Sequence, residues 1–458
     1  MHFSNQPYRP GETIAAVATP PGEGGVAMIR ISGDDAFEVA AKVFSGNLKR
    51  YQSHTAHYGK ILNTNGEKVD DVLILPMKKP KTFTGEDVVE IFCHGGSLIT
   101  RRVLETVLKA GARAAMAGEF TFKAFINGKI DLAQAEAIQD LICAKNERAL
   151  EAAESQLEGK LSKQILKFQN ELIGYAAILE AWVDFPEEGL EFAPIEEVIA
   201  AITSIHQEIE KLIFSFHEGR IIHDGLALCL VGSPNVGKSS LMNALLDKDR
   251  AIISDIPGTT RDVIEDHLRL NGINLRVIDT AGIREAKEAI EAEGIKRTHD
   301  IINKADLILL VLDATLGTDG VDKKLFELLD KKRTIVVWNK TDLPHETLPQ
   351  VDIPHVVFIS AKNKEGLEKL HQAIDEVIWQ GSIPSKEEIL VTNVRHKEAL
   401  SNAAHSLKAL IEGLNQGTSP EFLMIEMRSA LNELGKIIGF DAGEDILTAI
   451  FSKFCIGK

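Results

Sequence analysis

The segment GSPNVGKSS, residues 232–240, is the feature that most limits what this chain can fold into. It follows the apolar run LALCLV, leads into SSLMNALL, and matches the pattern G-x-x-x-x-G-K-[ST] from Gly232 to Ser239. Glycines in such a loop let backbone amides and the N-terminus of the next helix face a phosphate group. Lys238 can then reach the β- and γ-phosphates, and Ser239 can bind Mg²⁺. The pattern predicts an α/β domain that binds a nucleoside triphosphate.

Four further motifs indicate that the nucleotide is GTP. DTAG places Asp279 where it can hold Mg²⁺ through water, and Gly282 where its amide can meet the γ-phosphate. In NKTD, the carboxylate of Asp342 can accept from guanine N1–H and the 2-amino group, which adenine lacks. PGTTRD offers Thr260 as a second Mg²⁺ ligand that senses the γ-phosphate, and ISAK supplies a loop against the base. The predicted GTP contacts are Asn235, Val236, Gly237, Lys238, Ser239, Ser240, Ser254, Asp255, Ile256, Pro257, Gly258, Thr259, Thr260, Asp279, Thr280, Ala281, Gly282, Asn339, Lys340, Thr341, Asp342, Ser360, Ala361 and Lys362.

Apolar runs around these motifs predict a mostly parallel sheet. LALCLV, LRVIDT, LILLVLDA, TIVVWN and HVVFIS have the length and composition of strands buried on both faces. The Asn271-Gly272 dipeptide predicts a tight hairpin, which adds one antiparallel edge strand. Together with the motifs, these strands predict a Ras-like P-loop G domain over residues 223–383.

The residues expected to support hydrolysis differ from those of Ras-like enzymes, which place a Gln after the DTAG glycine to orient water. This chain has Ile283 there, and no arginine finger can be identified. The side chain of Asn235, with carbonyl groups of residues 254–259, could instead hold a monovalent cation that neutralises charge on the phosphates. The alternative, that Asn235 is only a turn residue, stays open.

The flanking regions have a different texture. Residues 12–124 mix short apolar runs with glycine-rich turns and predict an α+β domain. From Asp131 to Pro186 the chain has few breakers and helical spacing of apolar residues, and further helices are predicted over 195–216, 396–413, 421–438 and 443–454. The fold class is therefore multidomain α/β, with domains at 1–124, 125–222, 223–383 and 384–458. The G domain is inserted into the helical domain.

Composition excludes several classes of protein. No run of about 18 apolar residues could span a membrane, and the polar N-terminus lacks a signal peptide. The four cysteines are scattered without a CxxC pair, which disfavours a disulfide framework or a zinc site. The net charge of −16 argues against a generally basic nucleic-acid-binding protein. We expect a cytoplasmic protein that meets any RNA through a local patch or a partner.

The chain ends in FCIGK, with Cys455 four places from the terminus. A C-a-a-X ending would be a prenylation signal, but lysine is a poor last residue and no polybasic stretch accompanies it. An apolar stripe on the last predicted helix, formed by Ile446, Leu447, Ile450, Phe451 and Phe454, predicts a docked tail. Two interpretations of Cys455 stay open, a packed side chain and a reactive thiol.

These motifs, with others along the chain, resemble those of a known family over the whole length, the MnmE (TrmE) family of tRNA-modification GTPases. The resemblance lies in ATPPGEGGVAMIRISG, TGEDVVEIFCHGG, GEFTFKAFINGKIDLAQAEAI, GSPNVGKSSLMNAL, DIPGTTRD, DTAGIR, NKTD and FCIGK. It implies a homodimer built through a folate-binding N-terminal domain, and a heterotetramer with the flavoprotein MnmG. It also implies that the complex adds a carboxymethylaminomethyl group to C5 of the wobble uridine of certain tRNAs. The tRNA would be bound mainly through the partner.

The resemblance further implies cofactors and site residues in the G domain. GTP, Mg²⁺ and K⁺ are expected, with Ser239 and Thr260 as the Mg²⁺ ligands. The K⁺ ligands would be Asn235, Ser254, Ile256 and Thr259. The family's switch-region glutamate maps onto Glu291, which would position the attacking water. Alternatively, Glu285, Glu288, Glu291 and Glu293 form one solvated helix face.

For the N-terminal domain the resemblance implies 5,10-methylene- or 5-formyl-tetrahydrofolate as a one-carbon carrier. Its ligands would be Arg30, Glu90, Lys129 and Lys458, each of which could also be an ordinary surface charge. The tail would fold toward this site and present Cys455 as a catalytic thiol. A competing function is a regulatory GTP switch in ribosome assembly. A membrane-remodelling GTPase is disfavoured by the acidic charge.

Overall fold

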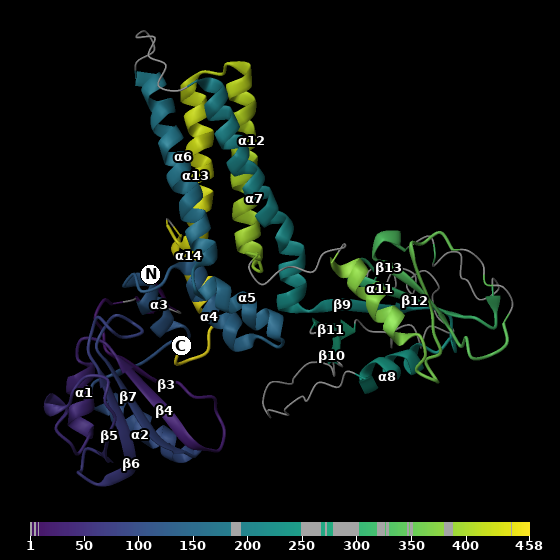
Figure 1. The fold of residues 1–458 in the computed structure, drawn as a ribbon. Coiled ribbons are helices and arrows are strands. Elements are labelled where there is room, and N and C mark those ends of the chain that lie inside the picture. The colour runs from purple at the N-terminus through teal and green to yellow at the C-terminus, as the bar shows by residue number, and fades with distance from the viewer. Residues whose placement is uncertain are drawn as a thin grey trace. The chain divides into compact units, whose positions relative to one another are not determined.

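The computed structural model describes residues 2–3, 6–7, 9–184, 194–248, 267–270, 273–277, 302–317, 326, 329–345, 348, 351–379, 388–440 and 442–458. Contacts divide the chain into two compact units. The first comprises Met1–Ile142, Gln156–Ile205 and Asn402–Lys458, and the second comprises Cys143–Ser155 and His206–Ser401. Both units are drawn in Figure 1.

The first unit contains a six-stranded sheet in the order β5-β6-β7-β4-β3-β8. Its strands are β3 (Ile14–Val17), β4 (Gly24–Ser32), β5 (His57–Leu62), β6 (Lys68–Met77), β7 (Val88–Gly95) and β8 (Arg113–Ala114). Only the short β3–β8 pair is parallel. Alternate residues of these strands pack one face of the sheet against α1 (Ala36–Val43) and α2 (Ser97–Lys109), which carry apolar stripes. The short elements β1 (His2–Phe3), β2 (Gln6–Pro7) and η1 (Leu48–Arg50) complete this region.

At the β3 end, the opposite face of the sheet is covered by α3 (Glu119–Ile126), whose Phe120 packs on Ile14 and Ala16. Partial cover by α3 leaves side chains of β4 and β7 at the boundary between a packed and an open surface. Tyr58 on β5 and Leu73 on β6 remain 70% and 47% exposed on the open part.

Helices follow the sheet in the first unit. They are α4 (Leu132–Cys143), α5 (Glu147–Leu157), α6 (Lys160–Asp184), α7 (Ile195–Asp224), α12 (Val394–Gln416), α13 (Pro420–Ile438) and α14 (Glu444–Phe451), and α5, α7 and α12 continue into the second unit. Figure 1 shows α6 and α13 side by side, and they are in contact along their length. The helix predicted from Asp131 to Pro186 is broken twice. Asn146 caps α5 by accepting from the amide of Ala149, and Gly159 turns the chain between α5 and α6 with φ +78°.

The second unit is built on a sheet in the order β10-β11-β9-β12-β13-β14. Its strands are β9 (Leu226–Val231), β10 (His267–Leu270), β11 (Ile273–Val277), β12 (Leu307–Asp313), β13 (Thr334–Asn339) and β14 (His355–Phe358). All pairs are parallel except β10 with β11, where Leu270 lies opposite Ile273, so the predicted antiparallel edge strand is confirmed. Asn271 and Gly272 themselves lie outside the described residues.

Two apolar cores cover the two faces of this sheet. Helices α8 (Lys238–Lys248) and α11 (Leu367–Trp379) contribute to one core, and a short 3₁₀ turn, η4 (Lys331–Arg333), precedes β13. Burial on both faces explains why the strands read as continuous apolar runs. The predicted fold class is confirmed, with an α+β domain, a helical domain and an α/β domain inserted between α7 and α12. No helix in the described part of the chain is long and apolar enough to cross a membrane.

Candidate functional site

The loop between β9 and α8 has the backbone of a phosphate-binding loop. Asn235 and Gly237 both adopt positive φ angles, +65° and +98°, so the chain curls on itself before α8 begins at Lys238. A Cβ atom on Gly237 would lie 2.2 Å from Nδ2 of Asn339, so only glycine fits there. The Lys238 ammonium group donates to the carbonyl oxygens of Gly232 at 2.6 Å and Ser233 at 2.8 Å. This places a positive charge and a helix N-terminus at one concave backbone turn.

Asn339 joins three of the predicted nucleotide loops. Its Nδ2 donates to the carbonyl of Val236 at 2.9 Å, and its Oδ1 accepts from the amide of Ala361 at 3.0 Å. The residue is 2% exposed, so these bonds are shielded from water. Ser360, also buried, caps the third loop by accepting from the amide of Asn363. The phosphate loop, NKTD and ISAK are therefore held together at the carboxyl ends of the strands.

Lys340 makes a second link in this region. Its Nζ lies 2.6 Å from Oδ2 of Asp313, the last residue of β12. Burial opposes ionisation of Asp313, but hydrogen bonds from Lys340 and Thr315 outweigh it and lower the pKa of this carboxyl group. Asp342 and Lys362 lie exposed in the neighbouring loops, where a base could reach them.

Other predicted nucleotide and metal contacts lie outside the described residues. They are Ser254, Asp255, Ile256, Pro257, Gly258, Thr259, Thr260, Asp279, Thr280, Ala281, Gly282 and Glu291. Ser239 and Ser240 are described, and both are exposed in the first turn of α8.

A second polar centre lies in the first unit, where Arg30 on β4 is directly opposite Glu90 on β7. The Nε and Nη2 groups of Arg30 lie 2.9 and 2.8 Å from the same carboxylate oxygen, Oε1. The side chains are 14% and 12% exposed. Among the described residues, none donates a hydrogen bond to the other oxygen, Oε2. Within the described part of the chain, one oxygen of this mostly buried carboxylate therefore accepts no hydrogen bond.

The C-terminal tail reaches this centre. Nη1 of Arg30 lies 3.4 Å from the carbonyl oxygen of Gly457, and the amide of Phe120 donates to the main-chain oxygen of Lys458 at 3.2 Å. Ile456 forms a bridge with Ala117. The prediction of a docked tail is confirmed, and two of the residues predicted for a folate site, Arg30 and Glu90, are brought together with it.

Cys455 is exposed within the docked tail. Phe451 and Phe454, which precede Cys455 in the chain, are buried, and Phe451 packs edge-to-face on Phe122 at 5.3 Å between centroids. The apolar residues of the last helix therefore supply the packing, and the interpretation of Cys455 as a buried plug is wrong.

Lys129, another predicted folate ligand, follows α3 and donates to the carbonyl of Pro80 at 3.0 Å. It holds the loop of residues 78–87 between β6 and β7. Two aromatic residues at the site were not predicted from the sequence. The guanidinium carbon of Arg30 lies 5.8 Å from the ring centroids of both Phe83 and Phe120. Phe120 lies within the family motif GEFTF, and Phe83 directly precedes the motif TGEDVV, but no local pattern links either ring to Arg30.

Comparison with known proteins finds relatives along the whole chain. Residues 132–455 match the family model of the MnmE helical domain, and residues 13–129 match that of the GTP-binding protein TrmE N-terminus. The tRNA modification GTPase MnmE of Protochlamydia amoebophila (strain UWE25) is 64% identical over 458 residues, covering 100% of both chains. Proteins of the same name from Thermoanaerobacter pseudethanolicus and Acetivibrio thermocellus are 44% and 45% identical, covering 98% of this chain and 99% of each relative. The similarity therefore extends over both units.

Proposed function

The chain belongs to the MnmE family of tRNA modification GTPases, and we propose that it hydrolyses GTP as a step in the modification of a tRNA nucleoside. The observation that carries the proposal is the joining of the phosphate loop, NKTD and ISAK by Asn339. This link supports simultaneous contact with the phosphates and the base of one nucleotide. The G domain is assigned to residues 223–383.

In the proposed mechanism, Lys238 leaves the loop carbonyls and donates to the β- and γ-phosphates, while Asp342 selects guanine. Ser239 and Thr260 would hold Mg²⁺, which offsets phosphate charge when bound. Asn235, Ser254, Ile256 and Thr259 would hold K⁺. The fit at Asn235 is supported by its exposed side chain on a residue of positive φ at the curl of the loop. Glu291 would orient the attacking water.

For the N-terminal domain, residues 1–124, we propose binding of a reduced folate that carries one carbon. The available Oε2 of Glu90 suits the amino and ring N–H donors of a pterin, and Lys129 and Lys458 suit a glutamyl tail. Cys455, exposed in the docked tail, is proposed as the thiol that takes part in one-carbon transfer. The product would be a carboxymethylaminomethyl group on C5 of the wobble uridine.

We propose further that the chain is a homodimer through the N-terminal domain and acts with MnmG in the cytoplasm as a heterotetramer. An apolar row across the open sheet face supports self-association, since Tyr58, Leu73, Phe92 and Met28 lie opposite one another on β5, β6, β7 and β4. The net charge of −16 supports tRNA binding mainly through the partner. The helical domain is assigned to residues 125–222 and 384–458.

The GTPase assignment and its cation are tested by phosphate release from the full chain with GTP or ATP, in K⁺ or Na⁺ at equal ionic strength. We expect hydrolysis of GTP but not ATP, faster in K⁺. Equal rates in the two salts would reject the cation ligands and leave the GTPase intact. No hydrolysis of GTP in either salt would reject the proposed activity.

A further inference from the structure

The loop of residues 78–87 brings an aromatic ring to the Arg30–Glu90 centre. Phe83 and Phe120 lie at equal distances, 5.8 Å, from the guanidinium carbon of Arg30. Phe120 is fully buried, whereas Phe83 is 37% exposed. Of these two rings, only Phe83 therefore offers surface to a molecule that binds beside Arg30 and Glu90.

Three polar side chains from α3 and the residues after it fix this loop. Nδ2 of Asn127 donates to the carbonyl of Thr84 at 2.7 Å, and Lys129 donates to that of Pro80. The third anchor is Lys123, whose ammonium group lies 2.7 Å from Oε2 of Glu86. The loop thus has anchors on both sides of Phe83.

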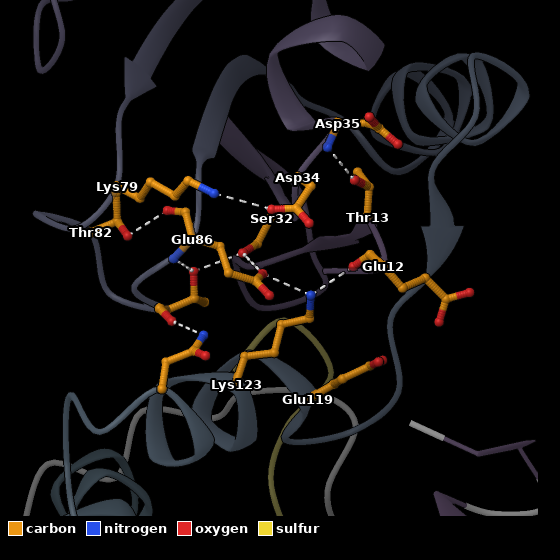
Figure 2. A network of polar contacts seen from close by, with 12 residues as sticks. Glu12, Thr13, Ser32, Asp34, Asp35, Lys79, Thr82, Glu86, Glu119 and Lys123 are labelled. Atoms are coloured by element: carbon orange, nitrogen blue, oxygen red, sulfur yellow. Dashed lines mark hydrogen bonds and ion pairs between the residues drawn. The ribbon is translucent and has the colours of Figure 1, made fainter. Parts of the chain in front are cut away.

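Figure 2 shows the buried network around the Lys123–Glu86 pair. Lys123 is fully buried and also donates to the carbonyl of Glu12 at 2.6 Å. Oε2 of Glu86 accepts from the hydroxyl of Ser32 at 2.9 Å, and that hydroxyl lies 2.7 Å from the hydroxyl of Thr84. A buried ion pair often contributes no more stability than apolar residues of similar size, and in some proteins its role is instead to specify one geometry. We therefore assign to the Lys123–Glu86 pair the role of fixing the geometry of the loop of residues 78–87.

Resting on the proposed folate function, we infer that Phe83 is the aromatic surface against which the pterin ring of the carrier stacks. The Lys123–Glu86 pair is a positioning unit that holds Phe83 beside Arg30. The ring would present its edge, which carries the N–H donors, to Oε2 of Glu90, and its face to Phe83. Stacking on aromatic side chains and in-plane hydrogen bonds use different parts of a flat heterocycle, so both can act at once.

The test titrates 5-formyltetrahydrofolate into the full chain by calorimetry. Phe83→Ala is expected to weaken binding by about tenfold, in the range that loss of one stacking contact gives, and Phe83→Tyr to retain it. Phe214→Ala is the matched control, because Phe214 is an exposed phenylalanine of α7 in the other unit. It should bind as the wild type does. Wild-type affinity in Phe83→Ala would overturn the inference, whereas no binding by the wild-type chain would reject the folate function itself and the inference with it.

The positioning role is tested with Lys123→Met/Glu86→Leu, which removes both charges and leaves neither unpaired. We expect near-wild-type GTP hydrolysis, a loss of folate affinity similar to that of Phe83→Ala, and no further loss when Phe83→Ala is added. Additive losses, or unchanged folate affinity, would overturn the role. If the double variant does not fold, Asn127→Ala removes one backbone anchor instead, and the same non-additivity with Phe83→Ala is required.

Discussion

At the scale of single residues, the four cysteines differ in what surrounds their sulfur atoms. Cys93 and Cys229 lie in the cores of the two sheets, and burial raises the pKa of each thiol to about 11. The charge of Asp70 adds to the shift at Cys93. Cys143 and Cys455 are exposed. Because the thiolate is the nucleophile, only the exposed pair can react readily near neutral pH.

We therefore predict selective alkylation. Iodoacetamide should modify Cys143 and Cys455 in the native chain, and Cys93 and Cys229 only after denaturation. Peptide mass spectrometry with and without denaturant measures this. Rapid native labelling of Cys93 or Cys229, or protection of Cys455 without added ligand, would contradict the burial described for these thiols.

A second residue-scale prediction concerns Asp313 and Lys340. Because the pKa of Asp313 is lowered on folding, the pair contributes its full stability above the ordinary aspartate pKa of about 3.9. That contribution is lost as the pH falls through the lower folded pKa. Asp313→Asn should destabilise the chain by about 1–3 kcal/mol near neutral pH, since a bond to a charged partner is lost. The difference in the free energy of unfolding between the wild type and Asp313→Asn should become smaller as the pH falls below about 3.9.

Urea unfolding of the wild type and Asp313→Asn, followed by fluorescence across this pH range, measures the effect. Asp352, which is exposed and paired with Lys331, provides the matched control Asp352→Asn, with little expected change. A difference for Asp313→Asn that is independent of pH would show that the charge of Asp313 is not what stabilises the loop.

At the scale of elements, the C-terminal tail depends on one glycine. Gly457 has φ +96°, and a Cβ atom there would lie 2.3 Å from the carbonyl oxygen of Val17 on β3. Gly457→Ala should undock the tail, since the backbone conformation alone costs about 1–3 kcal/mol for other residues. Carboxypeptidase digestion should become faster and 5-formyltetrahydrofolate binding weaker, with GTP hydrolysis unchanged. Gly443→Ala, with no atom within 4 Å of the added methyl, is the control. Equal digestion of the two variants would contradict this account.

Elements of the second unit were largely predictable because their signals are local. A parallel strand buried on both faces has a continuous apolar run, and Asn-Gly between two short alternating segments predicts the antiparallel pair that β10 and β11 form. The breaks between α4, α5 and α6 were missed. They depend on a single cap by Asn146 and on Gly159, and neither interrupts the apolar spacing that predicted one long helix.

The candidate sites also have parts that were predictable from local sequence and parts that were not. The phosphate loop was recognisable because its residues are consecutive. The link by Asn339 and the meeting of Phe83 with Arg30 were not, because they join segments far apart in the sequence. Nothing in the local sequence marks Lys123 as buried, and only the packed structure shows it against Glu86. Register between β4 and β7 is what turns two isolated charges, Arg30 and Glu90, into one centre.

At the scale of the whole molecule, the two proposed chemistries belong to different compact units. The nucleotide loops lie in the second unit, and the Arg30–Glu90 centre with the docked tail lies in the first. Variants at one site should therefore leave the other site intact. The claim that joins them is that GTP hydrolysis and one-carbon chemistry both serve one tRNA modification.

Mass spectrometry of tRNA nucleosides tests that claim most directly. A bacterial strain lacking its own relative of this chain would be complemented with the wild type, Lys238→Ala or Cys455→Ser. We predict that the wild type restores the carboxymethylaminomethyl group on the wobble uridine. Both variants should fail, with Cys455→Ser still hydrolysing GTP at the wild-type rate. If the wild type does not restore the group, the proposed function is contradicted and a regulatory GTP switch is favoured. Full modification by Lys238→Ala or by Cys455→Ser would show that the site changed in that variant is not needed for the modification.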